Sequence, residues 1–198
     1  MSSDDKAPLD TRIANGRVAG FDIAGVRLGM TPQEAIDRAA KAGFKISSSS
    51  TELSFADKRI EALRKRQPDF QGSKSAKVVR RQFFEGPQGD YLSVEFASMP
   101  EGSRVENISY TFKPSRTDAK DVERTIFKKF GSPNGRATMV GNFKWCDNQC
   151  QNGDASAELA LPVYNSVQID GRVPAQSYIQ KLIDADVDRL APKAKAGI

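Results

Sequence analysis

The 198-residue chain has a formal net charge of +5, 38% apolar residues and no histidine. Without histidine, the usual Ser-His-Asp and Cys-His nucleophilic sites and histidine-ligated zinc are excluded, and two cysteines cannot form a four-cysteine zinc site. No apolar run approaches the roughly 18 residues of a transmembrane helix, and neither a Walker A sequence nor a strand-linked dinucleotide-binding motif occurs. We therefore expect a protein that is not an enzyme and that uses no cofactor and no metal.

The N-terminal residues 1–18 are polar and predict a flexible tail. They contain no apolar segment typical of a signal peptide. Two explanations stay open: a cytoplasmic protein, or an exported protein whose signal was removed before Met1. Residues 21–30 alternate loosely between apolar and polar and predict a short strand or an extended lead-in.

A strong helix signal begins at Thr31. The hydroxyl of Thr31 suits an N-cap, and Glu34 can reach back to close a capping box. Pro32 falls at the first helical position, where its missing N–H costs nothing, and Gly43 favours a stop. The alanine-rich side of this helix predicts close packing on a sheet.

A meander follows in the first half of the chain. Residues 46–54 predict a loop, and residues 55–66 predict a second helix that Pro68 ends. Three strand-like runs rich in Val, Phe, Tyr and Ile follow at residues 76–86, 90–99 and 104–114. Turn-forming residues separate these runs, so an antiparallel meander is expected.

The same order of elements occurs again in the second half. Residues 117–133 predict a helix that Thr117 or Asp118 caps and Gly131 ends. Strand-like runs follow at residues 137–146, 155–163, 165–170 and 177–183, before a short fraying helix within 184–198. The predicted fold class is α+β, with helices packed on antiparallel β-sheet in a tandem pseudo-repeat. The units are 19–114 and 115–198, either separate or joined in one continuous sheet.

The stretch GVRLGMTPQEA resembles the Gly-x-x-x-Gly-Met-[Ser/Thr]-x-x-[Glu/Gln] signature of bacterial envelope modules. These modules include the SmpA/OmlA-type small outer-membrane lipoproteins and the beta-lactamase-inhibitor-protein-like fold. The signature residues are Gly25, Gly29, Met30, Thr31 and Glu34, and FKKFGSP closes the helix of the second half. The resemblance implies helices packed on one face of an antiparallel sheet, in an exported bacterial protein whose role is protein contact.

Cys146 and Cys150 lie in the stretch WCDNQCQNGD, at the end of a predicted strand and in its turn. A hairpin tip can bring residues four apart within the roughly 4.4–6.8 Å between Cα atoms that a disulfide requires. In an oxidising compartment the two would pair; two free thiols in a cytosolic protein are the alternative. The same loop is rich in Asp and Asn, but Glu158 falls one position short of the EF-hand spacing, so no calcium site is predicted.

Basic residues concentrate between Lys58 and Arg81, where nine basic and two acidic residues give a local charge of +7. The basic residues are Lys58, Arg59, Arg64, Lys65, Arg66, Lys74, Lys77, Arg80 and Arg81. This stretch is a candidate site for an anionic partner such as lipid headgroups or an acidic protein face. The alternative is a solvated helix face and edge strand. The neighbouring Phe83, Phe84 and Tyr91 are expected to alternate into a core.

These patterns favour a non-enzymatic bacterial envelope or periplasmic protein that acts through protein–protein contacts. The expected partner is another envelope protein, with anionic lipid headgroups as a second contact. The alternative is a cytoplasmic nucleic-acid-binding accessory protein, which the pI near 9.2 favours, although the local concentration of charge argues against nucleic acid. A carboxylate hydrolase would require a deep pocket with two facing carboxylates.

Overall fold

Strands make up the centre of the molecule. In the computed structural model of the chain, the described residues are 12–14, 16–73, 77–113, 118–136, 142–148, 150–151, 153–161 and 164–192. Their strands are β1 (Lys45–Glu52), β2 (Val78–Glu85), β3 (Tyr91–Met99), β4 (Gly102–Thr111), β5 (Gly135–Arg136), β6 (Asn142–Cys146), β7 (Ser156–Ala160) and β8 (Ser166–Asp170). Their helices are α1 (Pro32–Lys41), α2 (Phe55–Arg66), α3 (Ala119–Phe130) and α4 (Arg172–Leu190), with a short 3-10 helix at Val18–Gly20.

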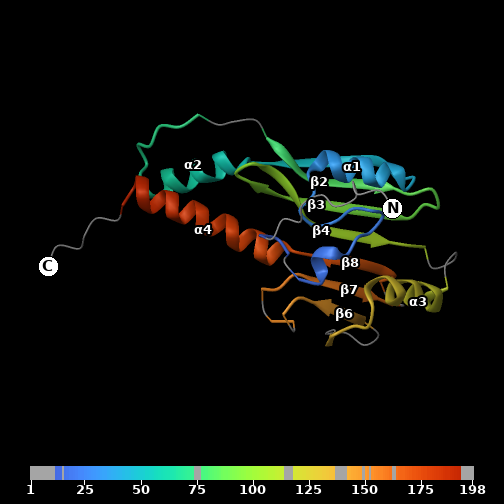
Figure 1. The fold of residues 1–198 in the computed structure, drawn as a ribbon. Helices are drawn as coiled ribbons and strands as arrows, with labels where there is room; N and C mark the ends of the chain where they lie inside the picture. Colours follow the sequence, from blue (N-terminus) through green and yellow to red (C-terminus); the bar gives the residue numbers. More distant parts are fainter. Residues whose placement is uncertain are drawn as a thin grey trace, which may run out of the picture.

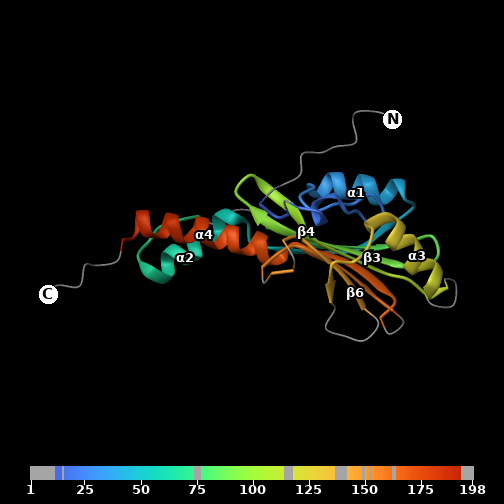
Figure 2. The ribbon, with the colours of Figure 1, turned by 60° about the horizontal axis from the view of Figure 1, so that its bottom comes forward.

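The strands form one antiparallel sheet in the order β1-β2-β3-β4-β8-β7-β6-β5 (Figure 1). Helices α1 and α3 lie over the two halves of the same sheet face, while α2 and α4 pack side by side and extend beyond the sheet (Figures 1 and 2). The predicted α+β class, with helices packed on antiparallel sheet, is confirmed. No helix within the described ranges has the length and apolar character needed to cross a bilayer.

Helix α1 is built as its sequence predicts. Thr31 Oγ1 accepts the Glu34 N–H at 3.3 Å, and Glu34 Oε2 accepts the Thr31 N–H at 2.8 Å, so the capping box is complete. The hydrogen bond from the Thr31 backbone holds the pKa of Glu34 below its ordinary value. Ala35 and Ala39 are fully buried; because their side chains are small, the helix can lie close to the sheet.

Helix α3 covers its half of the sheet with aromatic side chains. The rings of Phe127 and Phe130 meet Trp145 of β6 edge-on, with centroids 5.7 and 5.6 Å apart. Trp145 Nε1 donates to the carbonyl of Gly131 at 2.8 Å, which satisfies the indole N–H in a buried position. Phe21, from the segment before α1, stacks on Phe130 at 4.1 Å.

Three predictions about the elements are wrong. Residues 46–54, predicted as a loop, mostly belong to β1, whose serine-rich edge position leaves nearly every side chain exposed and so removes the alternation that marks a strand. Residues 177–183, predicted as a strand, lie within α4, where Ile179, Ile183 and Val187 recur at helical spacing on its buried side. The tail prediction for residues 1–18 fails from residue 12 onward, because Ile13 and Val18 are fully buried; residues 1–11 lie outside the described ranges.

The two predicted units meet inside the sheet. Strands β1–β4 fall in residues 19–114 and β5–β8 in residues 115–198. Antiparallel pairing of β4 with β8, from Asn107–Asp170 to Thr111–Ser166, joins them without a break. The tandem pseudo-repeat itself stays a prediction.

Candidate protein-binding face

The described helices leave the centre of the sheet face opposite α1 and α3 uncovered (Figure 2). The strands send rows of mostly polar side chains to this face. Successive side chains of a strand point to opposite faces, so Ser93 points away from the buried Leu92 and Val94. The residues paired with Ser93 on the neighbouring strands point to the same face and form a row across the sheet. The middle row consists of Ser48, Phe83, Ser93, Ser109, Gln168, Glu158 and Lys144.

Two further rows flank the middle one. One consists of Lys45, Glu85, Tyr91, Thr111, Ser166 and Ala160. The other consists of Ser50, Arg81, Glu95, Asn107, Asp170, Ser156 and Cys146. We call these three rows the open face. In the last row Glu95, Asn107 and Cys146 are buried, so the exposed part of the open face lies mainly in the other two rows. Its few large apolar groups contrast with the buried apolar side chains that the same strands send to the helix-covered face.

Two aromatic side chains project from this polar surface. Phe83 of β2 is 38% exposed and Tyr91 of β3 is 54% exposed. Phe83 pairs with Ser93 and Tyr91 pairs with Glu85, so the two aromatics are diagonal neighbours. The guanidinium of Arg81 lies 5.6 Å from the Phe83 ring centroid, within cation–π range.

The prediction that Phe83, Phe84 and Tyr91 all enter a core is therefore wrong for two of them. Phe84 is buried, and two adjacent strand residues cannot point to the same face. That alternation was the signal available in the sequence, but it does not say which of the two phenylalanines points inward.

An ion pair between a buried glutamate and a partly exposed arginine lies at one end of the open face. Glu106 is the extra residue of a bulge between β4 and β3, and Arg80 is the extra residue of a bulge between β2 and β1. Bulges redirect side chains, and these two meet: Arg80 donates to Glu106, which is fully buried, and to the Phe96 carbonyl at 2.9 Å. Burial alone would lower the pKa of Arg80, but hydrogen bonding to Glu106 raises it.

This pair is joined to α4. Gln176 Nε2 donates to Glu106 Oε2 at 2.7 Å. Arg172 is the first residue of α4, and its guanidinium lies 3.9 Å from the Glu95 carboxylate. Two nitrogens of Arg172 donate to Asp170, and this hydrogen bonding raises the pKa of Arg172. The carboxylates of Glu95 and Glu106 are therefore held by guanidinium groups, which suits anchoring of α4 better than acid–base chemistry.

Most of the nine basic residues of 58–81 lie on α2 or on β2. On α2, Arg59 pairs with Asp186 of α4 at 3.1 Å, which lowers the pKa of Asp186, and Arg66 pairs with Asp188. On β2, Arg80 pairs with Glu106 and Glu95, and Arg81 pairs with Glu95. Also on α2, Lys58 pairs with Glu52 at 2.9 Å, and Arg64 donates to the Gly72 carbonyl at 2.5 Å. Lys65 lines the groove between α2 and α4. Lys77 lies just before β2, and Lys74 lies outside the described ranges.

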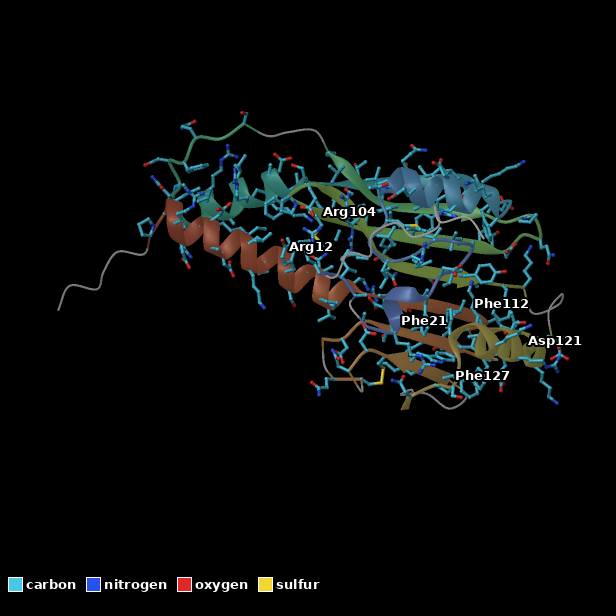
Figure 3. The ribbon with its side chains drawn as sticks, viewed as in Figure 1. Arg12, Phe21, Arg104, Phe112, Asp121 and Phe127 are labelled. Atoms are coloured by element: carbon cyan, nitrogen blue, oxygen red, sulfur yellow. A yellow bond between two sulfur atoms is a disulfide. The ribbon has the colours of Figure 1, made fainter. Side chains whose placement is uncertain are left out.

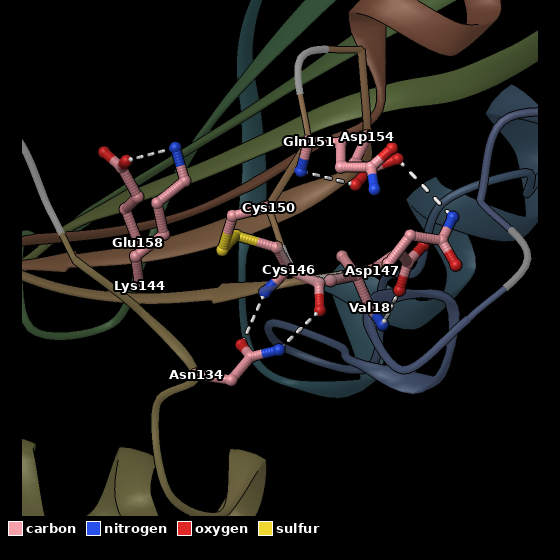
Figure 4. The surroundings of a disulfide bond; sticks show 10 residues. Val18, Asn134, Lys144, Cys146, Asp147, Cys150, Gln151, Asp154 and Glu158 are labelled. Atoms are coloured by element: carbon pink, nitrogen blue, oxygen red, sulfur yellow. Dashed lines mark hydrogen bonds and ion pairs between the residues drawn. A yellow bond between two sulfur atoms is a disulfide. The ribbon is translucent and has the colours of Figure 1, made fainter.

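The predicted cysteine pair is present as a disulfide, with 4.9 Å between the Cα atoms of Cys146 and Cys150 (Figure 4). The side chain of Asn134 binds both the N–H and the carbonyl of Cys146, at 2.9 and 3.0 Å. Asp147 accepts the N–H of Val18 at 2.9 Å, so it fixes the N-terminal segment. The described residues contain no cluster of three or more Asp, Glu, His or Cys side chains that could hold a metal ion.

Neither family models, nor curated proteins, nor solved structures match the chain. The resemblance of Gly25–Glu34 to envelope modules therefore stays a prediction.

Proposed function

We propose that this chain is a non-enzymatic protein of the bacterial cell envelope that binds another protein with its open face. The observation that carries the proposal is the uncovered polar sheet face with Phe83 and Tyr91 exposed side by side. Interfaces concentrate their binding energy in a few aromatic and Arg side chains surrounded by weaker polar contacts. The open face has this composition.

The size and charge of the open face suit a protein partner. Seven strands at about 4.8 Å spacing and three rows along each strand span about 29 Å by 14 Å between backbone positions, before side chains are added. This backbone area is about 400 Å², half of the ~800 Å² that each partner contributes to a specific interface, and the projecting side chains enlarge it. Several of its charges are already paired, as in Lys144–Glu158 at 3.1 Å, so a partner that covers these pairs buries no unpaired ion there.

The envelope location rests on two supports of different kinds. Disulfides persist in oxidising compartments and are rare in the cytosol, which favours export for a chain in which Cys146 and Cys150 are bonded. The module signature at Gly25–Glu34 favours the same location.

Binding of anionic lipid through residues 58–81 is a weaker proposal. Arg59 and Arg66 pair with acids of α4, Arg80 pairs with Glu106, and Arg81 pairs with Glu95. Paired cations attract a membrane less, so we expect weak retention on anionic vesicles. Binding of nucleic acid would rely on the same paired cations, so we expect it to be weak as well.

Site-specific photocrosslinking tests the open face. Tyr91 and Tyr164 are both 54% exposed, but Tyr164 lies outside the three rows. We would replace each with p-benzoylphenylalanine in the cells that make the protein. Position 91 should crosslink to one envelope protein and position 164 should not. Identical crosslinking patterns at both positions would contradict the proposal.

Once that partner is purified, calorimetry measures the contribution of each aromatic. Phe83→Ala and Tyr91→Ala should each weaken binding by about 2 kcal/mol, or about 30-fold. Tyr164→Ala is the matched control and should leave the affinity unchanged.

A further inference from the structure

A pocket of about 310 Å³ lies on the helix-covered side of the sheet, away from the open face. Its walls come from α3, from the turn before α1 and from the adjoining strands β4 and β8. The apolar lining residues include Ile23, Ala24, Tyr110, Phe112, Val122 and Ile126. Figure 3 shows Phe112 beside α3, near the end of the helix that carries Asp121.

The pocket follows from how the helices divide the sheet. Helix α1 covers the β1–β4 half and α3 covers the β8–β6 half (Figure 2). The seam between them, where Tyr110 of β4 pairs with Val167 of β8, forms the floor. Among the described residues, the turn at residues 22–25 reaches over this floor and leaves a space between α3 and the strands.

The backbone of that turn is strained at a residue that lines the pocket. Ala24 and Gly25 have φ values of +53° and +78°, and Ile23 and Val26 exchange N–H···O bonds of 3.0 and 2.9 Å across them. Such a two-residue turn favours Asn-Gly or Gly-Gly, because a left-handed backbone is unfavourable for alanine. The strain is tolerated where the Ala24 methyl forms part of the pocket wall, and strained residues cluster at functional sites.

The polar groups at the rim are paired with one another. Asp22 accepts from Lys129 Nζ at 2.8 Å and from the Gly25 N–H at 3.0 Å, and so fixes the turn to α3. Asp121 is paired with Arg124 at 3.0 Å. Among the described lining residues, the pocket therefore offers mainly apolar walls, and its charged rim groups are paired.

The aromatic floor also presents an apolar surface. Burial raises the pKa of Tyr110, and its hydrogen bond with Asp90 raises it further. Its hydroxyl is therefore a neutral phenol engaged by Asp90, and the ring is left to contact a ligand. Together with Phe112 it provides the aromatic surface typical of small-molecule sites.

We propose that this pocket binds a small, neutral, apolar molecule containing aromatic rings. A cavity of about 150 Å³ holds benzene, so the larger pocket has room for about two rings. The site is independent of the open face, which lies on the other side of the sheet. A ligand here would rest on both halves of the sheet and on α3.

Fluorescence titration with N-phenyl-1-naphthylamine, a neutral aromatic probe that brightens in apolar surroundings, tests the proposal. We expect saturable binding of one probe per chain. Val122→Phe, which fills the pocket, should weaken binding at least tenfold. Val173→Phe is the matched control, since Val173 is a helical valine that is 55% exposed and lies outside the pocket. Non-saturating fluorescence, or equal affinities for the two variants, would overturn the proposal.

A second variant keeps the test decisive if Val122→Phe fails to fold. Ala24→Asn suits the turn better but places a polar amide at the pocket wall. Its Tm should be equal to or above that of the parent chain while its probe affinity falls. An Ala24→Asn protein that is folded and binds the probe as tightly as the parent would also overturn the proposal.

Discussion

The ion pair between Arg80 and Glu106 gives the sharpest test of how the sheet and α4 are held together. In Glu106→Met, Arg80 loses the carboxylate partner and Gln176 loses its acceptor. Removing one partner of a buried pair costs about 3–5 kcal/mol. We expect the lower end, about 3 kcal/mol, because the Arg80 side chain is 30% exposed and a second carboxylate, Glu95, lies 3.7 Å away.

The double variant Arg80→Met/Glu106→Met separates two contributions to the loss of stability: the unpaired charge of Arg80 and the loss of packing. Replacing both ions with apolar side chains leaves no unpaired charge, so the double variant should be more stable than Glu106→Met alone. The coupling energy from the double-mutant cycle should then be about 2 kcal/mol, within the range for residues in contact.

Urea denaturation, with calorimetry alongside, measures these differences. A loss of about 3 kcal/mol corresponds to a fall in Tm of roughly 6–12 °C for a chain of this length. The control is Glu101→Met, which breaks the partly exposed pair of Glu101 with Arg12 and should cost less than about 1 kcal/mol. Equal losses from Glu106→Met and Glu101→Met, or simple additivity in the double variant, would refute the argument.

Two further measurements follow from local features. The disulfide between Cys146 and Cys150 closes a loop with a sequence separation of 4. Reducing it should lower the free energy of unfolding by about 2 kcal/mol. Measuring Tm with and without a reductant checks this prediction, and an unchanged Tm would contradict it. The pKa of Glu34 is lowered in the folded state by the Thr31 backbone. Its stabilising contribution is therefore present above the unfolded pKa and lost as the pH falls through the folded value. Glu34→Gln should destabilise the protein more at pH 7 than at pH 3, and an equal loss at both would count against the capping box.

Local signals in the sequence were sufficient for several elements. The capping box predicted the start of α1, and Asp118 caps α3 as one of the two predicted residues, accepting the Lys120 N–H at 2.8 Å. The predicted bounds of α2 agree with the structure. These features depend on residues within a few positions of each other, so a short stretch of sequence is enough to predict them.

The long-range features could not be derived in this way. Strand β1 owes its existence to backbone pairing with β2, which leaves no trace in its exposed serines. The meeting of Arg80 and Glu106 depends on two bulges in different strands, and a bulge changes direction without a distinct residue pattern. The open face became visible only with the register, because its rows combine residues from both halves of the chain.

The pairing of β4 with β8 has a consequence for how the chain folds. Each half can form its meander from neighbouring strands, but the seam joins residues as far apart as Asn107 and Asp170. Closing this long loop costs conformational entropy, so we expect the seam to form after the two meanders. At high concentration the same seam can close between two chains, with β8 of one chain beside β4 of another, which is the geometry of domain swapping. Refolding yield should then depend on protein concentration even though each meander is local.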